Sequence, residues 1–290
     1  MKIPGDAVDP TLPKFVTEYA THETTFHGIT TDPGDNYGIW DVTEVFPYYA
    51  TMNRQPYAVR CYENTLGLLN GGSNVPFIWQ AIDEPTEVNP PGYGGSKRKA
   101  WGLLDLWGDP KPVYGALKTL YPKIPVGSMV VTSPNQGSNI TYAGAYSYHN
   151  RIVVGIANEL SSAQINTVTL TNAPEDLRIV EALGFEPLYW GDTANGEPDI
   201  GQEVARALTL NTISSTSYWV EAELPGDSTL TIILTVKPDF NADGIVDIED
   251  LSTMATDWLQ GGSSADIAPA GGDGTIDSLD FGLLAKHWMY

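Results

Sequence analysis

The chain has little cysteine and few basic side chains. Its 290 residues contain one cysteine, Cys61, so no internal disulfide can form, and the apolar pattern around it predicts a buried core thiol. Lysines and arginines number 15 against 36 aspartates and glutamates, which gives a formal net charge of −21. Nucleic acids and anionic membranes are bound through basic patches. The charge balance therefore argues against both as partners.

Long apolar runs are also missing. The sequence contains no stretch of about 18 apolar residues, so it predicts no membrane-spanning helix. Residues 1–6 (MKIPGD) lack the apolar core of a secretion signal. Two interpretations are open at this point: the protein is cytoplasmic, or its natural N-terminus lies upstream of this chain.

What the sequence does contain is a calcium-loop pattern near its C-terminus. The residues at positions 1, 3, 5, 9 and 12 of one twelve-residue window are Asp239, Asn241, Asp243, Asp247 and Asp250. Ca²⁺ takes about six to eight oxygen ligands, and in such a loop the seventh residue, here Ile245, adds its carbonyl. Gly244 at position 6 permits the sharp turn. An acidic linker would not show this spacing, so we predict Ca²⁺ as a cofactor.

A helix and a second copy of the unit follow this loop. Apolar residues recur at helical spacing at Leu251, Met254, Ala255, Trp258 and Leu259, and after the second copy at Phe281, Leu284, Ala285 and Trp288. The candidate ligands of the second loop are Asp273, Thr275, Asp277 and Asp280. Counting back from Asp273 places Pro269 and Gly271 at positions 1 and 3, where neither offers a side-chain oxygen. Asp266 would be the first ligand only if this loop were about three residues longer.

Tandem loop–helix units without the entering helix of an EF-hand resemble the dockerin module. The resemblance covers Asp239 to Tyr290 and implies a small all-α calcium-binding module at residues 237–290. Dockerins attach extracellular polysaccharide-degrading enzymes to cohesin domains. The resemblance therefore implies a cohesin-type scaffold domain as partner and an extracellular setting.

Residues 1–125 show a different periodicity. Short apolar strands begin at Phe15 and at Pro76, and each ends in polar residues. A helix is predicted between them, from about Phe46 to Leu69, and another from Val113 to Leu120. The order strand, helix, strand, helix predicts β/α units of a parallel sheet.

These residues resemble the last two units of clan A glycoside hydrolases, which are retaining enzymes on a (β/α)8 barrel. The segment Thr17-Glu18-Tyr19-Ala20 matches the context of the clan's nucleophile at the end of strand 7, and Trp79 matches the tryptophan that stacks on the sugar after strand 8. Residues 101–105 and 110–112 match the segment before the last helix. The resemblance implies that Glu18 is the catalytic nucleophile and that a polysaccharide is the substrate. Within the clan, the family most resembled is family 86, the agarases and porphyranases.

Further side chains in the same part are candidates for substrate binding. Trp40 and Tyr37 offer flat faces for sugar rings, and His22 could bond hydroxyl groups. Core packing of the aromatic residues and a solvent-facing His22 are the alternatives. A whole barrel needs at least about 200 residues, so we expect six strands and the acid/base glutamate to lie outside this chain. The pair Asn158-Glu159 mimics the acid/base signature but follows Glu18 in another domain, and we reject it.

Residues 126–236 predict an antiparallel β-sandwich, because β-branched and aromatic runs alternate with turn clusters. The runs cover residues 128–132, 140–148, 151–157, 166–171, 178–182, 218–223 and 229–236. Five aromatic residues could form a glycan-stacking face, or could pack in the core or against the barrel. They are Tyr142, Tyr146, Tyr148, Tyr189 and Trp190.

The sequence as a whole predicts a multidomain chain, with a partial (β/α)8 barrel at 1–125, an accessory β-sandwich at 126–236 and a dockerin-like module at 237–290. We interpret it as the C-terminal part of a secreted, retaining endo-glycoside hydrolase whose signal peptide lies upstream. By itself this part is expected to be inactive. The alternative is a non-catalytic carbohydrate-binding or adhesion protein that docks to a scaffold.

Overall fold

The structure is a computed structural model that describes residues 15–19, 25–26, 29–30, 55–73, 75–78, 81, 103–104, 110–131, 141–160, 162–188, 200–259, 263–269 and 272–289. Within these parts, no helix is both long and apolar enough to cross a membrane.

The N-terminal part contains a parallel strand–helix–strand unit. Strand β1 (Phe15–Tyr19) pairs in parallel with β4 (Val75–Ile78), and helix α2 (Gln55–Asn70) lies between them in sequence. Helix α3 (Pro112–Leu120) follows, with Pro112 in its first turn, where a missing N–H breaks no helical hydrogen bond. The parallel pair agrees with the predicted order of β/α units. The predicted helix start near residue 46 lies outside the described residues.

The other described strands form antiparallel pairs. One sheet has the order β10-β9-β13-β7-β6-β5, a second has the order β11-β12-β8, and β2 pairs with β3. The strands are β2 (Thr25–Phe26), β3 (Ile29–Thr30), β5 (Met129–Val131), β6 (Thr141–Tyr148), β7 (Arg151–Asn158), β8 (Gln164–Thr171), β9 (Leu177–Leu188), β10 (Ile200–Ala205), β11 (Asn211–Ser214), β12 (Ser217–Leu224) and β13 (Ser228–Val236). The predicted β runs coincide with strands, whereas β2, β3, β10 and β11 were not predicted. Strands β5 to β13 are called the β domain below.

The two sheets of the β domain share one hydrophobic core. Alternate residues of β12 are buried, and among them Val220 and Leu224 join a cluster that also contains Ile152 of β7 and Ile232 of β13. A large aliphatic side chain buried in this way contributes roughly 1.5–3 kcal/mol relative to exposure. The facing rows of apolar side chains therefore hold the sheets together.

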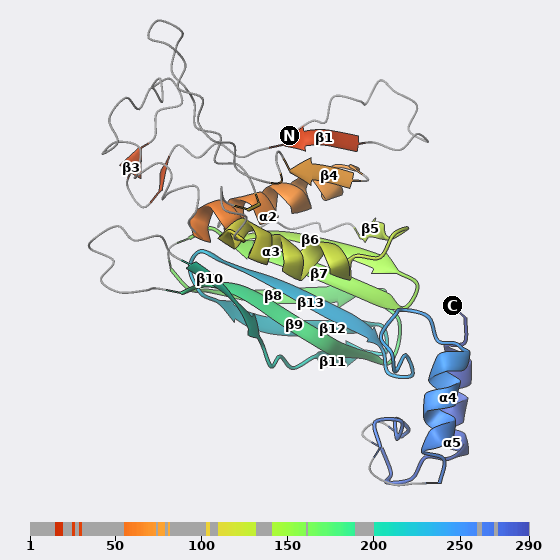
Figure 1. Ribbon diagram of the computed structural model, residues 1–290. Helices are drawn as coiled ribbons and strands as arrows, with labels where there is room; N and C mark the ends of the chain where they lie inside the picture. Colours follow the sequence, from red (N-terminus) through yellow and green to blue (C-terminus); the bar gives the residue numbers. More distant parts are fainter. Residues whose placement is uncertain are drawn as a thin grey trace, which may run out of the picture.

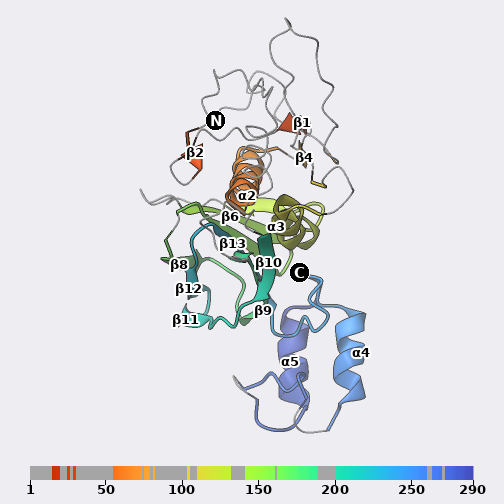
Figure 2. The same ribbon diagram turned by 60° about the vertical axis from the view of Figure 1, so that its left-hand side comes forward.

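Helices α2 and α3 cover the opposite face of the larger sheet (Figures 1 and 2). Every residue of β13 is buried, because one face meets the smaller sheet and the other meets these helices. The Tyr62 hydroxyl of α2 lies 2.7 Å from Thr231 Oγ1 and 3.1 Å from the Leu230 carbonyl oxygen. Cys61 is buried in the same interface, as predicted. At Gly155 of β7 a Cβ would lie only 2.8 Å from Leu66 Cδ2, so glycine allows the helix to approach the sheet.

The C-terminal module, residues 239–289, contains helices α4 (Ile248–Thr256) and α5 (Ser278–Lys286), which lie outside the two sheets (Figures 1 and 2). Met254 and Leu284 are buried, as the predicted apolar faces require. Trp258, Leu259 and Phe281 are exposed, so the predicted faces are wrong at these positions. The reason for the first two is that α4 ends at Thr256, and Leu259 lies beyond it at φ 63°.

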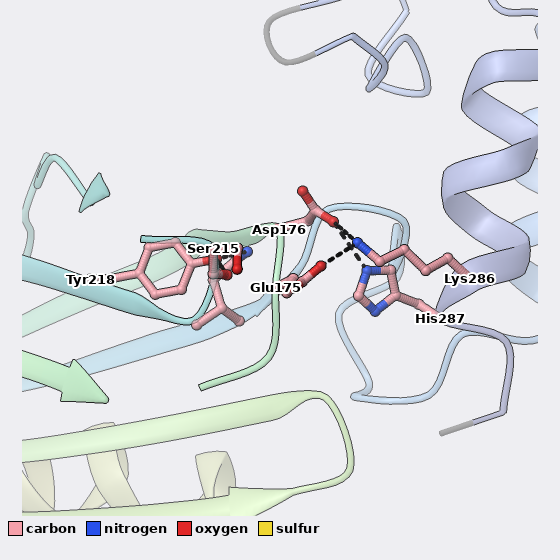
Figure 3. A network of polar contacts seen from close by, with 7 residues as sticks. Glu175, Asp176, Ser215, Tyr218, Lys286 and His287 are labelled. Carbon is pink, nitrogen blue, oxygen red and sulfur yellow. Dashed lines mark hydrogen bonds and ion pairs between the residues drawn. The ribbon is translucent and has the colours of Figure 1, made fainter. Parts of the chain in front are cut away.

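An ionic network joins the end of α5 to the β8–β9 turn (Figure 3). Lys286 Nζ lies 2.6 Å from Glu175 Oε2 and 3.0 Å from Asp176 Oδ2, and His287 Nε2 lies 3.3 Å from the same Asp176 oxygen. Burial alone would raise the pKa of Asp176, but hydrogen bonds and charges from Lys286 and His287 outweigh it and lower this pKa. The Asp176 carboxylate is therefore stabilised by the folded arrangement.

Replacing Asp176 with asparagine should lower the free energy of unfolding by up to about 1 kcal/mol at pH 7, since the pair is partly exposed. A lowered pKa gives stability that is present above the unfolded value near about 3.9 and is lost as pH falls through the folded value. Urea unfolding at pH 7 and pH 3 should therefore show the difference between Asp176→Asn and wild type only at pH 7. Glu203→Gln, which removes an exposed partner of Lys118, is the control. An equal loss at both pH values would contradict the ionic explanation.

Candidate functional site

Glu18 lies near the carboxyl end of β1, and the neighbouring parallel strand β4 ends one residue before Trp79 in the sequence. Glu18 is the fourth residue of β1, and Trp79 directly follows Ile78, the last residue of β4. Tyr19 is paired with Ile78, so the two strand ends meet at one edge of the pair. Barrel enzymes build their active sites at this edge. The described backbone therefore places Glu18 near the carboxyl end of β1, at the edge where β4 also ends.

The described part does not include the side chains of the predicted catalytic and sugar-binding residues. These are Glu18, His22, Tyr37, Trp40 and Trp79. Their roles stay predictions. The Tyr121 hydroxyl of the 3-10 helix η1 (Tyr121–Lys123) donates to the Pro76 carbonyl oxygen at 2.8 Å. This hydrogen bond attaches η1 to β4, the strand that precedes Trp79 in the sequence.

Asn158 and Glu159 connect the end of β7 to neighbouring elements. The Asn158 amide donates to the carbonyl oxygen of Pro225 at 2.8 Å and so closes the end of β7. Glu159 pairs with Arg60 of α2 at 3.1 Å. Burial raises the pKa of Glu159, and the Arg60 charge offsets only part of that rise. This ion pair links α2 to the β domain.

The tyrosines considered as a glycan-stacking face do not form one in the described part. Tyr146 is 2% exposed and packs under α2 and α3 together with Tyr142. Tyr148 makes an edge contact with His149, their ring centroids 4.5 Å apart. Tyr189 and Trp190 lie outside the described residues. The alternative in which these aromatics pack against the helical part is therefore correct for Tyr142 and Tyr146.

The first predicted calcium loop has a regular set of side-chain to backbone hydrogen bonds. Asp239 Oδ2 accepts from Gly244 N at 2.9 Å, and Asp243 Oδ1 accepts from Ile245 N at 2.8 Å. Asp250 closes the loop, because its Oδ1 accepts from Phe240 N at 2.7 Å and its Oδ2 from Asp247 N at 3.0 Å. Gly244 has φ 98°, a conformation that favours glycine. The twelve residues thus fold back on themselves as one closed loop.

One carboxylate oxygen inside this loop lacks a partner. Asp239 is 0% exposed, and its Oδ1 has no hydrogen-bond partner, while Oδ2 accepts from Gly244 N and Thr235 Oγ1. Burial raises the pKa of Asp239, and the neighbouring Asp250 and Asp243 charges raise it further. A buried, unsatisfied carboxylate oxygen is costly. A cation bound in the loop would remove that cost.

The second loop repeats these contacts with Asp266 as its first residue. Asp266 Oδ2 accepts from Gly274 N at 2.8 Å and its Oδ1 from Asp273 N at 3.0 Å. Asp280 Oδ2 accepts from Asp277 N at 2.8 Å, as Asp250 does from Asp247 in the first loop. Gly274 has φ 95°. These contacts support a loop lengthened by three residues between its first residue and its glycine.

Within the part of the chain that the structure describes, no three Asp, Glu, His or Cys side chains are gathered closely enough to hold a metal ion. The donors are nevertheless of the type that Ca²⁺ prefers, since all are oxygens. The unsatisfied Asp239 Oδ1 is a further point in favour of a cation. The residues therefore fit calcium in type and order, although the carboxylates accept bonds from the loop backbone here.

The comparisons with known proteins give a partial likeness of fold. No protein-family model and no curated protein sequence matches the chain. Similar solved structures include a glycoside hydrolase family 30 subfamily 8 xylanase from Clostridium acetobutylicum, with 13% identity over 63% of this chain and 40% of that chain and a TM-score of 0.43. The catalytic domain of family 30 xylanase C from Talaromyces cellulolyticus shows 16% identity, coverage of 78% and 41%, and a TM-score of 0.44. A family 39 enzyme from Xanthomonas axonopodis pv. citri shows 12% identity over 78% of this chain and 45% of that chain, with a TM-score of 0.39.

These structural neighbours are glycoside hydrolases, and this chain spans less than half the length of each. The likeness at such identities and TM-scores decides nothing about substrate or mechanism.

Proposed function

We propose that this chain is the C-terminal part of a secreted, retaining endo-glycoside hydrolase that acts on a polysaccharide. The observation that supports it most is the parallel pair β1–β4, whose carboxyl ends carry Glu18 and precede Trp79. In this proposal the Glu18 carboxylate attacks the anomeric carbon while the glycosidic C–O bond breaks. The leaving oxygen takes its proton from a second carboxylic acid, which a further β/α unit outside this chain supplies. Water then cleaves the glycosyl ester and gives its proton to that same residue.

The proposal includes calcium binding by the C-terminal module and attachment to a cohesin-type scaffold domain. The ligands of the first site would be Asp239, Asn241, Asp243, Ile245 (through its carbonyl), Asp247 and Asp250, and those of the second Asp266, Asp273, Thr275 (through its carbonyl), Asp277 and Asp280. Calcium would neutralise the clustered carboxylates of each loop and tie the loop to its helix. The paired hydrogen-bond patterns of the two loops and the unsatisfied Asp239 Oδ1 support this part.

The activity is tested by comparing this chain with the same chain extended upstream by the missing β/α units. We expect no measurable hydrolysis by the 290-residue chain, because a nucleophile without its acid partner cannot complete either step. The extended protein should cleave one member of a panel of xylan, arabinoxylan, agarose and porphyran. Proton NMR of the first product should show the anomeric configuration of the substrate. Turnover by the 290-residue chain alone would contradict the division of the site.

A further inference from the structure

The first calcium loop is held against the β domain by its backbone carbonyl oxygens. Arg178 Nη2 donates to the Asp239 carbonyl at 2.6 Å, and Arg151 Nη1 donates to the Ala242 carbonyl at 2.6 Å. The backbone N–H of the residue before Arg151 donates to the Gly244 carbonyl at 3.0 Å. Positions 1, 4 and 6 of the loop are therefore all bonded to the β domain.

Van der Waals contact adds to these bonds. A Cβ on Gly244 would lie 2.9 Å from Arg151 Cβ and 3.1 Å from the Tyr148 carbonyl oxygen, so the loop backbone touches the β6–β7 turn. Val246 of the first loop belongs to the same buried cluster as Ile232 of β13, and Ile267 and Ile276 of the second loop belong to it as well. Both loops therefore contribute apolar side chains to this core, and the first loop differs in that its backbone contacts the β domain.

The second loop has the same internal contacts but a different position. A Cβ on Gly274, the counterpart of Gly244, would meet no atom within 4 Å. Figures 1 and 2 show α4 leading away from the sheets and α5 returning toward them, so that the turn between them lies at the far end of the module. The chain therefore contains two similar loops, and the β domain contacts the backbone of the first.

We propose that calcium in the first loop stabilises the β domain as well as the module, and does so more strongly than calcium in the second loop, because only the first loop's carbonyl oxygens accept the hydrogen bonds from Arg151, Arg178 and residue 150. This inference rests on the proposed calcium binding. The three carbonyl bonds require the loop conformation in which Ala242 has φ 61° and Gly244 has φ 98°. Without a cation the clustered carboxylates repel one another and oppose that conformation. Because linkage is reciprocal, contact with the β domain must also raise the affinity of the first loop for calcium.

The two loops supply a matched pair of ligand variants. Asp243→Ala and Asp273→Ala each remove an exposed carboxylate that precedes the loop glycine. Hydrogen exchange of the intact chain is measured with 1 mM Ca²⁺ and with chelator. Backbone amides of β7 and β13 should exchange about tenfold more slowly when calcium is bound, a factor within the usual range of coupling between two sites. Asp243→Ala should lose this protection. Asp273→Ala should keep most of it.

A second matched pair of variants leaves the charge of both loops unchanged. Gly244→Ala and Gly274→Ala strain the backbone to a similar degree, because both positions have φ near 95°. Only the alanine at 244 would also collide with the β domain. We therefore expect Gly244→Ala to weaken calcium binding by its loop about tenfold more than Gly274→Ala weakens binding by the other loop, as titration calorimetry can measure.

The outcomes separate the two proposals. Calcium binding at the first loop with unchanged exchange in β7 and β13 would overturn the coupling and leave calcium binding standing. Equal effects of Asp243→Ala and Asp273→Ala on the β domain would overturn it as well. Absence of any calcium heat in the wild-type chain would overturn the calcium proposal and the coupling together.

Discussion

Replacing Glu18 with glutamine in the proposed glycoside hydrolase, with this chain extended upstream, should lower turnover by roughly a thousandfold or more, while substrate binding changes little. The amide keeps the shape of the carboxylate but cannot attack the anomeric carbon, so the glycosyl-enzyme ester does not form. Initial rates on the cleaved polysaccharide measure the loss. Binding of the same polysaccharide by calorimetry shows that the site still accepts substrate.

Glu159→Gln is the matched control for this prediction. Glu159 follows Asn158 and so mimics the acid/base signature, but it lies directly after β7 and pairs with Arg60. The substitution should leave turnover near the wild-type value. Azide added to a Glu18→Gly variant should restore turnover and yield a glycosyl azide of inverted configuration, because azide then takes the place of the carboxylate. Near wild-type turnover of Glu18→Gln would require another nucleophile.

Removing calcium should unfold the C-terminal module. Its two helices have nine residues each, and Met254 and Leu284 are among the few large side chains that they bury. So small a unit cannot offset its chain entropy without bound metal. Chelation should therefore reduce helical circular dichroism and change the fluorescence of Trp258 and Trp288, and added calcium should reverse both changes.

Titration calorimetry of the intact chain with calcium should show two binding events. The Asp266 carboxylate accepts hydrogen bonds from the backbone N–H groups of Asp273 and Gly274, just as the Asp239 carboxylate accepts one from Gly244. This likeness favours calcium binding by the second loop. We expect it to be the weaker site, because Pro269 and Gly271 bring no side-chain oxygen to it. Asp239→Ala should abolish the tighter event. A single event that survives Asp239→Ala but not Asp266→Ala would reverse this assignment.

Local patterns determined much of the fold. The spacing of Asp239, Asp243 and Asp250 predicted a closed loop because the contacts of such a loop are formed by residues at most twelve apart. Runs of β-branched and aromatic residues between turn clusters predicted most strands of the β domain for a similar reason, since each run consists of a few consecutive residues. The parallel pair β1–β4 followed from the order of strand and helix.

The sequence-based predictions were wrong where the burial of a side chain depends on which element packs against it. The helical period placed Trp258 on an apolar face, but α4 ends at Thr256 and leaves that side chain exposed. Tyr146 qualified as a glycan-stacking residue by its chemistry, yet it lies under α2. Strands β10 and β11 carry too few apolar residues for their periodicity to reveal them.

The sequence by itself determined the loops, most of the strands and the place of Glu18 at a strand end, because these depend on residues close together in the chain. Only the tertiary structure decided that α2 and α3 cover the larger sheet. It also decided that the backbone of the first predicted calcium loop contacts the β domain, while the second loop lies at the far end of the module. The physical reason is that a periodic pattern shows that a surface is buried but not what covers it. Arg178 and Asp239 are 61 residues apart, and no local spacing relates them.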